Sequence, residues 1–173
     1  LLLILILTLS FQSLTKADDI KDFEIEGMSI GDNLLEYFSN DEISQFSISF
    51  GPLHNAIEIS SDDKNRADYY PLEKYDGLQI SYKKKNNTFY EITSISGSKW
   101  YNDDIKNCLK KKNEIKPSIE NFLESSIIAK NDATEKRKHW ADKTGKSFTY
   151  DTTYYFENDN QIRLDCFDWS KEM

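Results

Sequence analysis

The chain has 173 residues, of which 38% are hydrophobic and 13% aromatic, and its formal net charge is -8. This apolar content excludes a disordered chain and predicts one domain, or two small halves that share a core. Nucleic-acid binding is also disfavoured, because a duplex binder needs a contiguous basic surface. The basic clusters here, at 83–85, 110–112 and 136–138, are short and scattered.

The first segment is an apolar run over residues 1–11, and Leu14-Thr15-Lys16-Ala17 then ends in a small residue. A run of this length suits a signal-peptide core and is shorter than the roughly 20 apolar residues that span a bilayer. We therefore expect residues 1–17 to be a signal peptide and residues 18–173 to form a single domain. The expected location is the periplasm or the medium, with no stable membrane insertion after the leader is removed.

Residues 23–43 read as a short strand, a turn and a helix. Phe23 and Ile25 alternate with acidic residues, and Gly27 interrupts the run. Apolar residues then recur at roughly helical spacing, at Met28, Ile30, Leu34, Leu35 and Phe38. Ser29 or Asp32 would cap this helix. The pattern places Leu34 and Phe38 in the core.

Alternating residues predict strands at 46–50 and 56–59, and the first of these ends at Gly51-Pro52. A stronger pair follows at 77–82 and 88–97, joined as a hairpin across 83–87. In this pair, Leu78, Ile80 and Tyr82 would face Tyr90, Ile92 and either Ser94 or, if the strand bulges, Ile95.

The pattern is helical again from 102 to 125, with Pro117 inside it, so we expect a kink or a break at that residue. Strands at 147–156 and 161–169 would form a last hairpin across Asn158-Asp159-Asn160. The predicted fold class is therefore α+β, an antiparallel sheet covered by two helices. The order also fits two helix-then-hairpin halves, although no repeat at a fixed period supports a duplication.

Cys108 and Cys166 are the only cysteines, and each lies in an otherwise apolar element. An exported chain meets an oxidising environment, in which paired thiols normally cross-link. We expect a disulfide between the second helix and the last strand. Two separately buried thiols are the main alternative, and reactive or metal-bound thiols are a third.

Two resemblances involve the same stretches of sequence. At 23–38, 139–147 and 166–170 the chain resembles small exported proteins of marine alphaproteobacteria that have no assigned activity. This resemblance extends over the mature chain and implies export and a shared fold. Gly27-Met28-Ser29 before a short helix also resembles the opening of outer-membrane-assembly and β-lactamase-inhibitor-like α+β modules. The Gly-Pro that usually closes that helix is absent.

No catalytic, cofactor or metal site follows from the motifs. Gly145-Lys146-Ser147 imitates the end of a phosphate-binding loop. That motif also requires a glycine at position 140, where this chain has tryptophan. His54 and His139 have no neighbours at metal-ligand spacing. The alternative is a hydrolase or thiol-dependent enzyme that uses His139 with a carboxylate or a cysteine, since such partners meet only in space.

The best candidate for a binding loop is 139–147, which lies between two predicted secondary-structure elements. It contains aromatic rings, both signs of charge and a glycine. Its candidate binding residues are His139, Trp140, Asp142, Lys143 and Lys146. The alternative is that this segment only connects the two elements and has no binding role. The sequence thus predicts an exported binding or protein-interaction module that is not an enzyme, with a protein or small molecule as its partner.

Overall fold

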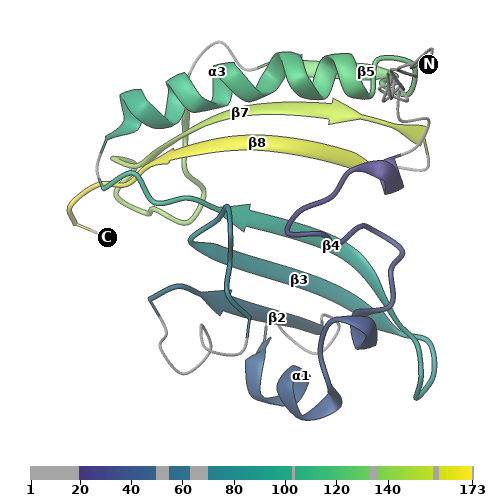
Figure 1. The fold of residues 1–173 in the computed structure, drawn as a ribbon. Helices are drawn as coiled ribbons and strands as arrows, with labels where there is room; N and C mark the ends of the chain where they lie inside the picture. Colours follow the sequence, from purple (N-terminus) through teal and green to yellow (C-terminus); the bar gives the residue numbers. More distant parts are fainter. Residues whose placement is uncertain are drawn as a thin grey trace, which may run out of the picture.

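The computed structural model describes residues 20–49, 55–62, 70–102, 104–132, 136–157 and 160–172. The expected signal peptide and His54 lie outside these residues. Within them the chain forms α-helices and two antiparallel four-stranded sheets (Figure 1), which confirms the α+β fold class. None of the helices in these ranges is long and apolar enough to cross a membrane.

The first sheet has the order β1-β2-β3-β4. Its strands are β1 (Ser47–Ser49), β2 (Asn55–Ser60), β3 (Gly77–Lys84) and β4 (Tyr90–Ser98). These confirm the strands predicted in this part of the sequence. The register shifts beside Tyr82, so that Tyr82 pairs with Ile92 while Ile80 pairs with Ile95. The bulge therefore brings Ile95, rather than Ser94, against the core.

The first helix lies further along the chain than predicted. It is α1 (Asn40–Phe46), preceded by a 3-10 turn at Leu34–Glu36, and residues 28–33 are not helical. Ser39 caps α1 in a capping box with Glu42. The strand predicted at Phe23 is reduced to one bridge between Ile25 and Met28.

Hydrogen bonds to β4 explain this difference. The Gly31 N–H donates to the Ile92 carbonyl, and the Ile92 N–H donates to the Asp32 carbonyl, both at 2.8 Å. Gly31 also has a φ of 95°, which excludes a right-handed helix at that residue. The apolar spacing nevertheless predicted the core correctly, because Leu34 and Phe38 are both buried in it.

The second sheet is built around β7 (Phe148–Tyr155), which pairs with β5 (Ala129–Asp132) and β6 (Arg137–Lys138) and also with β8 (Gln161–Asp168). β7 and β8 are the predicted hairpin, whereas β5 and β6 were not predicted. Their side chains are exposed, so they carry no apolar alternation.

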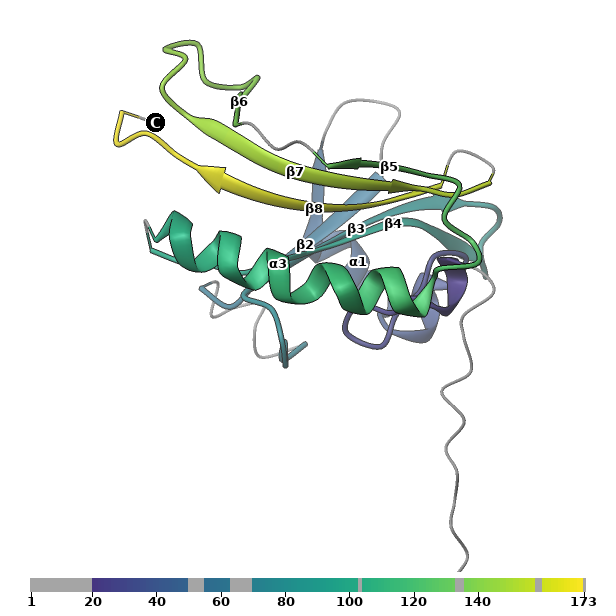
Figure 2. The same cartoon turned by 90° about the horizontal axis from the view of Figure 1, so that it is seen from above.

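Helix α3 (Ile105–Phe122) lies along one face of β7 and β8 (Figures 1 and 2). It continues through Pro117, so of the expected kink or break the break is wrong, and the kink stays a prediction. Pro117 and Asn113 are both exposed. The Asn113 carbonyl, which loses its helical donor to the proline, can therefore bond to water.

The apolar residues gather in two separate clusters. One lies between the first sheet and residues 28–46, and the other lies between α3 and the second sheet. Each helix thus covers its own sheet, and the order of a helix followed by antiparallel strands occurs twice. The strand orders of the two halves differ, since only the second sheet has two strands on the same side of a central one.

Candidate functional site

The loop 139–147 is held in shape by the carboxylate of Asp142. Its Oδ1 accepts hydrogen bonds from the backbone N–H and the hydroxyl of Thr144, both at 2.7 Å. Its Oδ2 accepts from the backbone N–H groups of Lys146 and Ser147. The bonds from Thr144 and Ser147 hold the pKa of Asp142 well below its usual range. Asp142 therefore fixes the loop and is buried inside it.

Four aromatic side chains meet beside this loop, and we call them the aromatic cluster: His139, Trp140, Phe167 and Trp169. The ring centroid of His139 lies 4.3 Å from that of Trp169 and 5.2 Å from that of Phe167. Trp140 also stacks on the histidine, with the two ring centroids 5.9 Å apart. His139 is only 7% exposed, whereas Trp140 is 91% exposed.

The structure separates the predicted binding residues by role. His139 and Trp140 lie in the aromatic cluster, Asp142 supports the loop, and Lys143 is exposed. Lys146 forms an ion pair with Glu172. The contribution of β8 to this surface was not predicted from the sequence. A usable signal was the alternation of Phe167 and Trp169 around Asp168, at the end of a strand that alternates apolar and polar residues.

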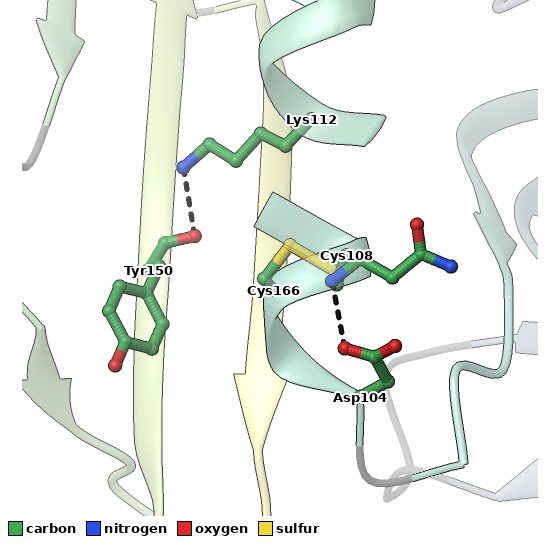
Figure 3. Close-up of a disulfide and its surroundings, with 6 residues drawn as sticks. Asp104, Cys108, Lys112, Tyr150 and Cys166 are labelled. Carbon is green, nitrogen blue, oxygen red and sulfur yellow. Dashed lines mark hydrogen bonds between the residues drawn. A yellow bond between two sulfur atoms is a disulfide. The ribbon is translucent and has the colours of Figure 1, made fainter. Parts of the chain in front are cut away.

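Cys108 and Cys166 form the predicted disulfide, with Cα atoms 6.0 Å apart (Figure 3). The bond joins the first turn of α3 to β8. One helical turn further along, Lys112 is buried and donates to the Tyr150 carbonyl at 2.9 Å. Burial lowers the pKa of this lysine. Both contacts fix the first half of α3 to the second sheet.

A groove of about 780 Å³ runs between β4 and β8. Its walls are the second half of β4 and nearly all of β8, and α3 contributes Ile105, Cys108, Lys111 and Lys112. Phe167 and Trp169 line one end, so the groove is continuous with the aromatic cluster there. Trp100, which is 52% exposed, lies at the same groove.

The disulfide bears on the thiol-dependent enzyme that the sequence left as an alternative. Both cysteines are in the disulfide, so neither offers the free thiol that a Cys-His pair with His139 requires. The Nδ1 atom of His139 accepts a hydrogen bond from the Ala141 N–H at 3.2 Å. Within the described ranges, no three His, Cys, Asp or Glu residues are grouped so that they could hold a metal ion.

Comparison of the chain with protein-family models, curated proteins and solved structures finds no match. The resemblance to small exported proteins therefore stays a prediction.

Proposed function

We propose that this chain is an exported binding module that contacts a partner protein through the aromatic cluster. The observation that carries the proposal is the exposure of Trp140, at 91%, beside three other rings. Exposed tryptophan is uncommon on a surface that faces only water, and tryptophan is enriched among the residues that dominate protein interfaces. Phe167 and Trp169, each 45% exposed, extend the same surface.

The hydrogen bonds that hold the loop 139–147 in shape favour a binding role over a plain connection. Asp142 holds four hydrogen-bond donors of the loop, and the Ser147 hydroxyl accepts a bond from the Ser170 N–H at 3.0 Å. The loop and the end of β8 are thus joined before any partner arrives. A preformed surface loses less conformational entropy on binding, which leaves more of the contact energy for affinity.

Export is proposed on two grounds. The first is the apolar leader pattern at residues 1–17, and the second is the Cys108–Cys166 disulfide, because such bonds persist in oxidising compartments. Mass spectrometry of the periplasmic fraction should find a chain that begins at Asp18. Recovery of the uncleaved chain from the inner membrane would contradict export.

The binding surface can be tested with a photo-crosslinking amino acid at position 143, an exposed residue of the same loop, so that Trp140 is kept. The experiment uses extract of cells that export the protein. The matched control places the same amino acid at Tyr155, which is also exposed and lies at the opposite end of β7. We expect a defined crosslinked protein from position 143 alone. Excess purified wild-type chain should suppress this product, and the Trp140→Ala variant should not.

Two results would decide against the proposal. Equal crosslinking from positions 143 and 155 would mean that the cluster is not a specific contact surface. Suppression by Trp140→Ala as strong as by wild type would mean that the exposed indole contributes nothing. Crosslinks to saccharide alone would favour a small-molecule or glycan partner instead, since aromatic faces also stack on sugar rings.

A further inference from the structure

The groove between β4 and β8 is bounded on both sides by strand edges. β4 is the last strand of the first sheet, and β8 pairs only with β7 in the described part of the chain. The two strands run in the same direction in both views of the fold (Figures 1 and 2). Each therefore presents one edge of its backbone to the space between them.

The first half of β4 has its outer edge covered, whereas within the described ranges the second half has no such backbone partner. Ile92 exchanges backbone hydrogen bonds with Gly31 and Asp32, as described above. Beyond Ile92, the residues Ser94–Ser98 line the groove instead. The facing wall is β8, from Gln161 to Asp168 except Ile162. Backbone N–H and C=O groups along such edges need partners, which a further strand supplies in the geometry of a sheet.

The two faces of the groove differ in polarity, because side chains alternate along each strand. On the face that carries the two apolar clusters lie Ile95 of β4, Leu164 of β8 and the Cys108–Cys166 disulfide. Lys111 and Lys112 of α3 add two basic side chains to the lining. On the opposite face lie Ser94, Ser96, Arg163 and Asp165. A strand placed between these walls would direct one set of side chains to an apolar surface and the other to a polar one.

An unsatisfied acceptor also lies in this groove. The Oδ2 atom of Asp165 is paired with Arg163 at 3.0 Å, but the buried Oδ1 atom has no hydrogen-bond partner. A buried polar atom without a partner is costly, and an occupant that carried a hydroxyl or ammonium donor at this point would satisfy it.

We propose that the groove binds an extended polypeptide segment of alternating apolar and polar residues, which adds as a strand between β4 and β8. A polypeptide fits better than a glycan, because two facing rows of backbone donors and acceptors match the repeat of another strand. This inference goes beyond the proposed function. The groove touches the aromatic cluster only at Phe167 and Trp169, and Trp140 is not part of its lining.

The test uses a peptide fused to the chain, which raises its effective concentration to the order of millimolar and makes weak binding visible. A short alternating valine-threonine segment is joined to the C-terminus through a glycine-serine linker. Trp169 already lines the groove, so this end of the chain is close to it. The matched control carries proline at alternate positions of the same segment, which removes backbone donors and prevents strand pairing.

Amide hydrogen exchange is then compared over Ser94–Ser98 and Gln161–Asp168. We expect at least about tenfold slower exchange in the alternating fusion than in the proline control, because strand addition protects edge amides. Equal exchange in the two fusions would overturn the inference. So would slower exchange on adding cell-wall saccharides to a fusion whose own peptide has no effect, since that result would assign the groove to a glycan.

The same fusion with Trp140→Ala separates the two proposals. Protection of the strand edges should survive this substitution, whereas crosslinking from the aromatic cluster depends on the indole. Loss of protection in the Trp140→Ala fusion would show that the groove is not an independent site, and would also count against the inference.

Discussion

Asp151 and Asp165 lie directly opposite each other on the paired strands β7 and β8. The side chain of Asp151 is 2% exposed and pairs with Arg137, while that of Asp165 is 18% exposed and pairs with Arg163. Burial, with a smaller contribution from the charge of Asp151, raises the pKa of Asp165 despite its arginine neighbour. The ionised carboxylate of Asp165 is therefore destabilising in the folded protein.

We expect Asp165→Asn to stabilise the fold at pH 7 by about 0.5 kcal/mol, the scale of a repulsive cross-strand pair. The folded state binds the Asp165 proton more tightly than the unfolded state does. Wild-type stability should therefore fall as the pH rises from the unfolded pKa, near 3.8, through the raised folded pKa. Urea titrations at several pH values measure this. The gain should vanish below pH 3.8, and a gain that persisted there would show that charge is not the cause.

Replacement of Asp142 by alanine should loosen the loop 139–147 without unfolding either sheet. The backbone N–H groups of Thr144, Lys146 and Ser147 lose their shared acceptor, so their hydrogen exchange should accelerate and the melting temperature should fall. Lys143→Ala is the matched control, since this neighbouring side chain is exposed. Unchanged exchange at these amides in the Asp142 variant would refute the supporting role of the carboxylate.

Loss of the disulfide should lower the free energy of unfolding by about 4 kcal/mol in the chain-entropy model, given the separation of 58 residues. The Cys108→Ser, Cys166→Ser double variant should match the reduced wild-type protein in a denaturant titration. Thiol titration of the denatured, unreduced wild type should find no free sulfhydryl. Two free thiols would contradict the bond, and a negligible stability difference would contradict its structural role.

Phe38→Ala should cost about 3 to 5 kcal/mol, because the ring is 3% exposed and its removal leaves a cavity in the first cluster. Lys110, an exposed residue of α3, should change stability by less than about 0.5 kcal/mol on substitution by alanine. Similar losses in both variants would argue against the buried position of Phe38.

The predictions from the sequence were most accurate where the local pattern of apolar residues matches the burial of those residues in the folded protein. The alternation at 77–82 and 147–156 predicted strands because each of these strands has one face on a core. The spacing at 28–38 predicted the right core residues in the wrong conformation. Gly31 and Asp32 bond to Ile92, some sixty positions later, and this pairing overrides the local helical preference.

Sequence patterns were enough to predict the fold class, most strands, the core positions of Leu34 and Phe38 and the pairing of Cys108 with Cys166. Local periodicity and residue chemistry are enough for these features. Long-range contacts were needed to place α1, the exposed strands β5 and β6, the aromatic cluster and the groove. Each of these depends on contacts between residues distant in sequence. Such contacts produce no periodic pattern of apolar residues in either segment.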